Sequence, residues 1–452
     1  MEEDGDTPSS PSPPCIINTI QHIRILTQSL SSDDPASQLE ATTEICKLLS
    51  KGQIALIDQA IREGIVPQLV RFLERNDIPQ LQSKAACILT NITSGTSESE
   101  HTRTVIKHGA VPLLVNLLYR GNYDMKEQAL RVLGNIAGDS QSTRDDVLSH
   151  GALLPLFGLL WNPTIVKPSI LRIGTWTLSH LFHGKPPSKL LQQIQPALPF
   201  VHNLLLMADE EVVVNACRTL SYLTHDGSSK MIQAVIDANV CPRLVELLQS
   251  LESNVAAPIL VTLRNLTLGD EAQTQILIDN GVLPCLKLVL SSCDKIVLRH
   301  ACSVISNITR GNISQIQAVI DVDLISPLVC LTKAEFDIKQ EVAQAIVNAA
   351  DGTPQQIQFL ASKGCIEALC DLLTCPDPTT MTSCLSGLYN ILLAGETYKG
   401  DTVWVNVYAE KVDKCGGLEK IESLQCNDNN GVSTMAMDIL GTYWPESGSE
   451  QD

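Results

Sequence analysis

The phrases GIVPQLVRFL at residues 64–73 and GAVPLLVNLL at residues 109–118 are two copies of one pattern. The pattern returns as NVCPRLVELL at 239–248 and as GVLPCLKLVL at 281–290. Its proline recurs at intervals of 45, 43, 44, 43, 42 and 43 residues, at Pro67, Pro112, Pro155, Pro199, Pro242, Pro284 and Pro327. Each proline can open a helix at its first turn, where a missing N–H costs nothing. The chain is therefore an internal repeat.

A second phrase follows the first at a fixed lag and carries an asparagine. It reads ACILTNITSG at 86–95, ALRVLGNIAG at 129–138, ACSVISNITR at 301–310 and VAQAIVNAAD at 342–351. The apolar residues fall at helical spacing, and glycines such as Gly95 and Gly138 predict where the helix ends. Each unit is thus a short helix, a helix opened by the proline phrase, and a longer helix that carries the asparagine.

This period predicts the fold class. Repeats of about 40–47 residues built from two or three helices are typical of armadillo and HEAT proteins. One unit cannot bury its apolar face alone, so the units stack. We expect an all-α, right-handed superhelical solenoid of about ten armadillo repeats over residues 16–445, with a concave groove suited to extended peptides. Residues 1–15 (acidic, Pro/Ser-rich) are expected to be disordered, and residues 446–452 form an acidic tail.

Composition narrows the range of partners. The 452 residues carry a formal charge of −18, which argues against nucleic acid and favours basic partners, although an acidic surface often serves only solubility. No segment is apolar and long enough to span a bilayer, so no membrane partner is expected. Fifteen cysteines without a Cys-x-x-Cys pair indicate reduced, mostly buried thiols. We expect a protein of the cytoplasm and nucleus.

No catalytic site is predicted. The sequence contains no G-x-x-x-x-G-K-S/T phosphate loop, no G-x-S-x-G elbow and no H-E-x-x-H pair. His180 and His183 share a helix face but have no Cys or His partners at ligand spacing. We therefore expect neither an enzyme, nor a metal site, nor a cofactor.

The asparagine of the second phrase recurs at one position of successive repeats, and we call this set of positions the asparagine column. At intervals of 41 to 45 residues it reads Asn91, Asn135, His180, Tyr222, Asn265, Asn307, Asn348 and Asn390. Six asparagines at one helix position resemble the ladder of the importin-α family. The resemblance implies that each carboxamide, with one donor and one acceptor group, holds the backbone of an extended localisation-signal peptide. The alternative is that each asparagine satisfies the backbone of the neighbouring repeat.

The resemblance covers about residues 16–445. Strings such as SDDPASQLEATTEICKLLS at 32–50 are similar to importin-α, and the ending LEKIESLQCNDNNGVSTMAMDILGTYWPE at 418–446 is similar to its plant branch. It implies a nuclear import adaptor that binds the basic localisation signals of cargo proteins. Gly95, Thr102 and Asp139 match positions around a buried lysine of the signal. Gln128 and Glu127 would form a polar wall, although Glu127 is equally well explained as a solvated acidic face.

Two departures from the family matter. Tryptophans that precede each asparagine by one turn flank the signal's basic side chains, but only Trp176 remains here. The full column reads Cys87, Arg131, Trp176, Arg218, Val261, Ser303, Gln344 and Ser386. Also, no Arg/Lys-rich segment precedes Arg24, so we expect no stable complex with importin-β. The alternative function is a non-transport armadillo scaffold that binds a different, less basic extended partner.

Overall fold

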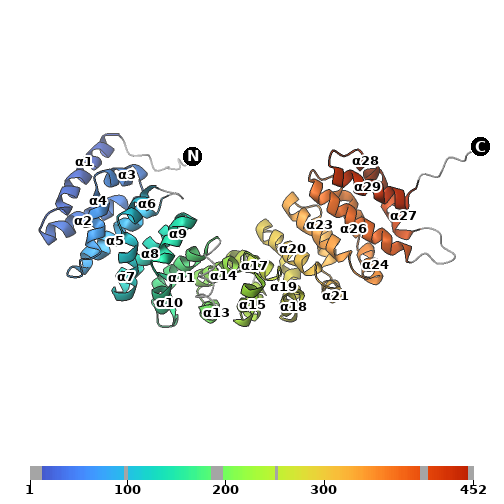
Figure 1. Ribbon diagram of the computed structural model, residues 1–452, viewed down its shortest axis with the longest axis horizontal. Coiled ribbons are helices and arrows are strands. Elements are labelled where there is room, and N and C mark those ends of the chain that lie inside the picture. Colours follow the sequence, from blue (N-terminus) through green and yellow to red (C-terminus); the bar gives the residue numbers. More distant parts are fainter. Residues whose placement is uncertain (1–12, 96–99, 185–196, 250–252, 398–405, 446–452) are drawn as a thin grey trace, which may run out of the picture. The chain divides into compact units, whose positions relative to one another are not determined.

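The computed structural model describes residues 13–95, 100–184, 197–249, 253–397 and 406–445. In these ranges the chain forms helices and turns and no strand (Figure 1). The helices fall into two compact units, residues 1–223 and 224–452. Of the expected N-terminal segment 1–15 only residues 13–15 are described, and they open the first helix. The expected acidic tail 446–452 lies outside the described residues.

Unit 1 contains five consecutive repeats. The first consists of two helices, and the first-helix position of the fifth repeat lies outside the described residues. The helices are α1 (Pro13–Leu30), α2 (Pro35–Leu49), α3 (Ile54–Arg62), α4 (Ile65–Phe72), α5 (Pro79–Thr93), α6 (Glu100–Lys107), α7 (Ala110–Arg120), α8 (Tyr123–Asp139), α9 (Gln141–Ser149), α10 (Leu153–Leu160), α11 (Pro168–Phe182), α13 (Leu198–Leu205) and α14 (Glu210–Leu223).

Unit 2 contains five further repeats, each of three helices. The helices are α15 (Ser229–Asp237), α16 (Cys241–Gln249), α17 (Ser253–Leu266), α18 (Glu271–Asp279), α19 (Val282–Val289), α20 (Lys295–Thr309), α21 (Ile313–Asp321), α22 (Ile325–Leu331), α23 (Phe336–Ala349), α24 (Pro354–Ser362), α25 (Cys365–Leu372), α26 (Pro378–Glu396), α27 (Val407–Lys414), α28 (Gly417–Leu424) and α29 (Asn430–Tyr443). The prediction of an all-α fold of about ten repeats is confirmed.

The proline phrase opens a helix in every repeat where it occurs. Pro67 and Pro112 are the third residues of α4 and α7, within the first turn, where their missing N–H leaves no acceptor unpaired. The residue before these helices adopts a left-handed conformation, with φ of 82° at Gly64 and 80° at Gly109. Asn239 takes the same role with φ of 58°, because asparagine tolerates this region better than most residues. This explains why the repeated phrase begins with Gly or Asn.

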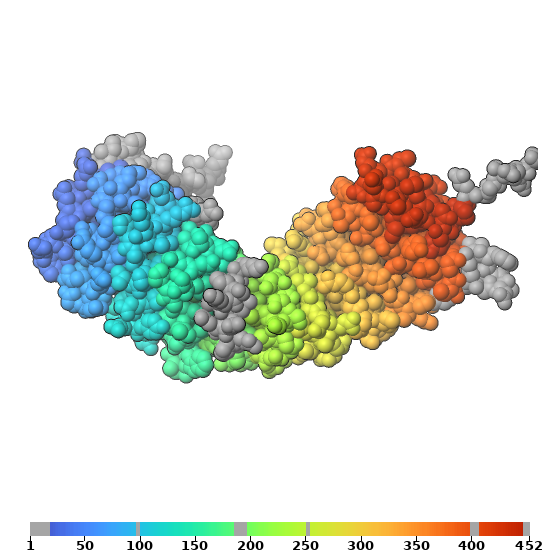
Figure 2. Space-filling view, in the orientation of Figure 1, coloured from blue at the N-terminus to red at the C-terminus, as the bar shows by residue number. Residues whose placement is uncertain are grey.

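The long helices stack to form the core of each unit. In unit 1, α5 packs against α8, α8 against α11, and α11 against α14; in unit 2, α17, α20, α23, α26 and α29 pack in succession. Leu89, Ile92, Leu133 and Ile136 are completely buried between them. Consecutive repeats follow one another along each unit without interruption, as the colour order of the surface shows (Figure 2).

One helix end differs from the sequence prediction. Gly138 does not end its helix but lies inside α8, which continues to Asp139. Ser140 then closes α8 and opens α9, where its hydroxyl accepts from the Thr143 N–H. The glycine serves close packing instead of helix termination, as the next subsection describes.

No single helix in the described ranges is long and apolar enough to cross a membrane. The pair α21 and α22, bent by 81° where they meet, satisfies the length and composition criterion only when the two are taken together.

Candidate functional site

The asparagine column lies in the C-terminal halves of the long helices, where each helix meets that of the preceding repeat. Asn135 of α8 donates from Nδ2 to the Thr90 carbonyl and to Thr93 Oγ1 of α5, both at 3.2 Å. Asn307 of α20 repeats this arrangement on α17, donating to the Arg264 carbonyl and to Thr267 Oγ1 at 3.1 Å. The carboxamide therefore caps carbonyls at the end of the neighbouring helix. Both bonds use the nitrogen, which leaves the oxygen to accept from a ligand.

The asparagines are not equally accessible. Asn348 is only 8% exposed, and its Nδ2 donates to the Ser306 carbonyl at 2.8 Å while its Oδ1 accepts from Gln344 at 2.7 Å. Asn265 is 1% exposed and accepts from Arg264 at 3.3 Å. Asn390 donates to the Asp351 carboxylate. Asn135 of unit 1 and Asn307 and Asn348 of unit 2 therefore all bond a carbonyl of the preceding repeat, as the alternative considered from the sequence expects, and in unit 2 the Asn265 and Asn348 oxygens are also occupied.

The expected lysine-pocket residues lie on α5, α6 and α8 of unit 1. Asn91 is half-buried, and its Nδ2 makes no hydrogen bond within the described residues. Gly95 is exposed just beyond the end of α5, whereas Thr102 of α6 is completely buried. Asp139 is the last residue of α8, four residues after Asn135, so the two share one helix face. Gln128 is half-buried near the start of the same helix. The ligand-binding roles of all five remain predictions.

Two glycines of α8 leave space for rings of α11, Gly134 for Trp176 and Gly138 for His180, and we call each of these spaces a seat. A Cβ at Gly134 would lie 2.1 Å from Cζ3 of Trp176, and one at Gly138 would lie 2.5 Å from Nδ1 of His180. The Trp176 and His180 rings lie with their centroids 4.5 Å apart and their planes tilted by 59°. Any larger residue at either glycine would therefore displace a ring. Sequence reasoning missed this role, although two glycines four residues apart inside a helical pattern are a detectable signal.

His180 is uncharged at neutral pH. Burial, with smaller contributions from His183 and Arg218, lowers its pKa to about 4. Tyr222, the next residue in the column, packs edge-on against His183 with ring centroids 4.9 Å apart. These rings continue the ring contacts of Trp176 along α11 and α14, so that the column carries aromatic rings at His180 and Tyr222 instead of asparagine.

The remaining positions of the tryptophan column carry polar or small side chains. Arg131 pairs with Glu127 at 2.9 Å, and the other oxygen of Glu127 accepts from Ser169 at 2.9 Å. Glu127 is therefore engaged within the protein, not displayed as a solvated acidic face. Cys87 Sγ lies 2.6 Å from Cys46 Sγ, and this hydrogen bond lowers the pKa of the Cys87 thiol. Arg218 is exposed.

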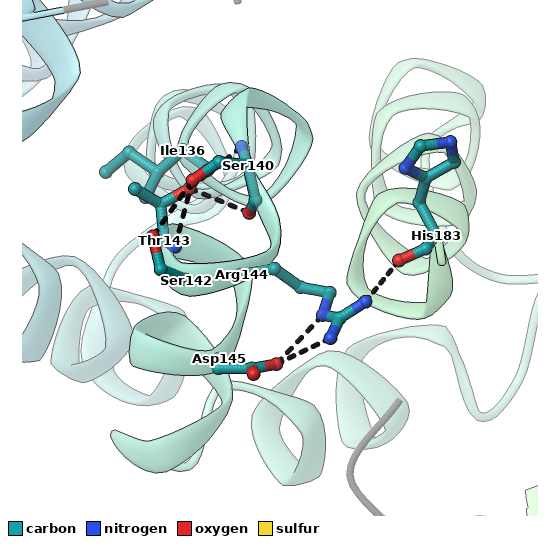
Figure 3. A network of polar contacts seen from close by, with 7 residues as sticks. All are labelled: Ile136, Ser140, Ser142, Thr143, Arg144, Asp145 and His183. Atoms are coloured by element: carbon teal, nitrogen blue, oxygen red, sulfur yellow. Dashed lines mark hydrogen bonds and ion pairs between the residues drawn. The ribbon is translucent and has the colours of Figure 1, made fainter. Parts of the chain in front are cut away.

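A buried arginine fixes the end of the helix that carries Trp176 (Figure 3). Arg144 of α9 is 1% exposed, and its guanidinium donates to the carbonyl of His183 just beyond α11. It also donates to Asp145 at 2.7 and 3.0 Å, so its charge is paired. On the other side of the same turn, Thr143 donates to the Ile136 carbonyl of α8 at 2.7 Å. The segment after Asp139 thereby links the C-terminal ends of α8 and α11.

The described residues contain no group of three or more His, Cys, Asp or Glu side chains arranged to hold a metal ion. What the unit 1 arrangement offers is a carboxylate, carboxamides and an aromatic face within neighbouring helices. Such groups suit reversible recognition of an extended, partly basic chain.

Comparison with known families agrees with the repeat pattern. Residues 55–94, 98–138, 228–268 and 353–393 match the armadillo/beta-catenin-like repeat, and residues 406–452 match an atypical Arm repeat.

Full-length relatives are similar over nearly the whole chain. Importin subunit alpha-1b of Oryza sativa subsp. japonica is 48% identical, over 94% of this chain and 80% of its own length. Importin subunit alpha-3 of Arabidopsis thaliana is 49% identical, over 93% of this chain and 79% of its own length. Importin subunit alpha-8 of Arabidopsis thaliana is 40% identical over 92% of each chain.

Solved structures share the fold. An engineered protein superposes with a TM-score of 0.83 at 26% identity, covering 92% of this chain and 98% of its own. A designed armadillo repeat protein, determined in complex with the peptide (KR)4, superposes with a TM-score of 0.50 at 30% identity. It covers 54% of this chain and 99% of its own.

Proposed function

The chain belongs to the importin-α family of armadillo-repeat proteins, and on this premise we propose that it is a nuclear import adaptor of the cytoplasm and nucleus. It binds localisation-signal peptides of cargo proteins on the face of unit 1 formed by α5, α8 and α11. The observation that carries this assignment is the grouping of Asn135, Asp139 and the glycine-seated Trp176 on two packed helices. The relatives named importin subunit alpha and the designed armadillo protein bound to (KR)4 support it.

Each group has a distinct task in peptide binding. The carboxamide oxygen of Asn135 accepts from a peptide N–H, while its nitrogen stays bonded to α5 and holds the side chain in place. The Asp139 carboxylate pairs with the ammonium group of a lysine. The Trp176 ring covers the aliphatic stem of a neighbouring basic side chain. None of these steps changes a covalent bond, so the proposed role is binding and release.

Affinity for a purely basic signal is expected to be lower than in an importin-α with a complete tryptophan column. Each cation–π contact contributes about 0.5–2 kcal/mol. On the face formed by α5, α8 and α11 two rings are lost, at Cys87 and Arg131, which would weaken binding about five- to thousand-fold. Arg131 is neutralised by Glu127, which limits its repulsion of a basic peptide.

One observation favours a second candidate function. Arg218 is exposed in the column where a basic peptide would run, next to the aromatic rings of His183 and Tyr222. A scaffold that binds a less basic extended partner would use this charge, whereas a carrier of strongly basic cargo would not. The two functions differ in the charge of the preferred ligand.

A titration separates them. The full chain is titrated into a fluorescein-labelled peptide with five consecutive Lys/Arg residues, and into a counterpart in which these are alanines, at about 150 mM salt, where the Debye length is about 8 Å. We expect saturable anisotropy changes for the basic peptide only. Equal binding of the two peptides would remove the import-adaptor assignment and leave the scaffold.

A further inference from the structure

Large apolar side chains are exposed together at one edge of unit 1. Tyr119, Tyr123, Leu154, Trp161 and Ile165 each expose between 50 and 76% of their surface. All five line one open hollow of about 470 Å³, beside α7, α8 and α10. Single exposed apolar residues are ordinary in soluble proteins, but a contiguous group around a hollow marks an interaction surface.

Four of the five residues come from equivalent turns of two adjacent repeats, and Leu154 lies in the first turn of α10. Tyr119 and Tyr123 flank the turn between α7 and α8, and Trp161 and Ile165 lie in the turn between α10 and α11. Gly121 makes the first turn tight, because a Cβ there would lie 2.5 Å from the Leu117 carbonyl oxygen. The repeats bring these two turns side by side, so that the rings converge on one hollow.

The same turn is polar in several other repeats, although between α13 and α14 it carries the exposed Leu206. Between α4 and α5 it carries Arg75 and Asp77, which form an ion pair at 2.8 Å. Between α19 and α20 it reads SSCD at 291–294, and between α22 and α23 it reads TKAE at 332–335. The repeat fold therefore does not require apolar side chains at this position. Their presence in two neighbouring turns points to a binding role.

The hollow is separate from the peptide-binding face proposed above. Tyr123 is the first residue of α8, whereas Asn135 lies twelve residues later in the same helix. At 1.5 Å per residue these positions are about 18 Å apart along the helix axis. A ligand in the hollow would leave Asn135, Asp139 and Trp176 free to bind their own ligand.

The one charged side chain among the described residues that line the hollow is basic, against the trend of the chain. Lys126 lines it, and Lys167 Nζ lies 5.5 Å from the centre of the Tyr123 ring. Among the described residues that line it there is no aspartate or glutamate, although the whole chain carries a formal charge of −18. We propose that this hollow docks a peptide segment of a partner protein in which apolar or aromatic anchors are flanked by acidic side chains.

The volume and chemistry set what such a segment must contain. A hollow of this size accepts one or two large side chains, for which the rings of Tyr119 and Trp161 provide flat contact surfaces. Carboxylates beside these anchors pair with Lys126 and Lys167 at the rim. The N-terminal residues 2–12 and the tail 446–452 of the chain itself are acidic but contain no large apolar residue, so they do not supply the anchors.

A peptide selection tests the proposal and defines the ligand in the same experiment. A phage-displayed random dodecapeptide library is panned on the full chain, with the double variant Trp161→Ser/Ile165→Ser used for counter-selection. Both residues are exposed, so the variant should keep the wild-type circular dichroism and melting temperature. Leu206→Ser, which removes an exposed apolar residue of unit 1 outside the hollow, is the matched control.

We expect the selection to enrich peptides that combine Phe, Trp or Leu with Asp or Glu. A selected peptide should bind the double variant at least about tenfold more weakly than the wild type and the Leu206→Ser control. Lys126→Glu should also weaken it, whereas binding of the basic peptide of the previous subsection should not change. The proposal fails if no enriched peptide depends on Trp161 and Ile165, or if those that do are basic. It also fails if ultracentrifugation shows a wild-type dimer that the double variant abolishes, since a second copy then covers the hollow.

Discussion

Units 1 and 2 carry the same column of long helices but use it differently. Unit 2 keeps asparagine at all four column positions, but Asn265 and Asn348 are almost completely buried and only Asn307 and Asn390 are half-buried. Unit 1 keeps only Asn91 and Asn135; both are half-buried, and Asn135 shares a helix face with Asp139. The number of asparagines is therefore a poor guide to which unit binds a peptide.

The residue one turn before each asparagine explains much of the difference. In unit 2, Gln344 reaches forward and occupies the oxygen of Asn348, which removes the acceptor that a peptide backbone would use. In unit 1 the corresponding residue of the third column position is Trp176, whose ring lies against that of His180. Gln344 thus satisfies Asn348 internally, whereas Trp176 supplies a half-buried aromatic ring at the equivalent position of unit 1.

The largest expected effect concerns the carboxylate of unit 1. Asp139→Lys should weaken binding of a basic peptide by at least about 100-fold, because it replaces an attractive charge pair with a repulsive one. Asp124→Lys makes the same charge change in the first turn of the same helix and should have a far smaller effect. Anisotropy titrations of both variants at equal salt measure the difference. Similar losses for the two variants would mean that net charge, not a lysine site, governs binding.

Restoring tryptophans should sharpen the contrast between the units. The double variant Cys87→Trp/Arg131→Trp adds two ring walls beside Asn91 and Asn135, for a gain of about 1–4 kcal/mol in peptide binding. The matched change in unit 2, Ser303→Trp/Gln344→Trp, should gain less, since Ser303 and Asn348 are each only 8% exposed and leave a new ring little accessible surface. Calorimetric titration of both double variants measures the gains. If the unit 1 variant binds no better than wild type, the groove serves another ligand.

The glycine seat of Trp176 gives a stability test. Gly134→Ala should lower the free energy of unfolding by about 1–3 kcal/mol, because the new Cβ overlaps the indole ring of Trp176. The displaced ring should also weaken binding of the basic peptide. Gly158→Ala is the control: it lies within α10 with open space around its Cβ. There alanine should be neutral or stabilise by up to about 1 kcal/mol. Urea denaturation followed by tryptophan fluorescence reports both changes, and equal destabilisation would show that the seat is not tight.

The smallest expected effects separate structural from binding asparagines. Asn348→Ala should cost unit 2 about 1 kcal/mol of stability without changing peptide affinity, since it removes one of the donors to the Ser306 carbonyl, which keeps the Arg310 N–H and the Thr309 hydroxyl. Asn135→Ala should lower the affinity for the basic peptide about three- to tenfold. Thermal melts and titrations on both variants give the comparison. A loss of affinity in Asn348→Ala would place part of the peptide on unit 2.

The repeat was predictable because its signals are local. The recurring prolines and the Gly or Asn before them each act through their own backbone, so the helix order and the number of repeats followed from spacing alone. For the site, the sequence predicted which helix positions the asparagines and tryptophans occupy, but not which of these side chains are accessible. Which asparagines are buried depends on packing between repeats, and the seats that Gly134 and Gly138 provide depend on rings 42 residues later in the sequence. Read locally, Gly138 looked like a helix end.

The most direct test of the account is to locate a bound basic peptide. A peptide with five consecutive Lys/Arg residues and one benzophenone side chain is bound to the full chain, irradiated, and its cross-links are mapped by mass spectrometry. The account predicts cross-links on α5, α8 and α11 within residues 91–180, which Asp139→Lys abolishes. Cross-links concentrated on α17, α20 and α23, and unaffected by that substitution, would contradict it.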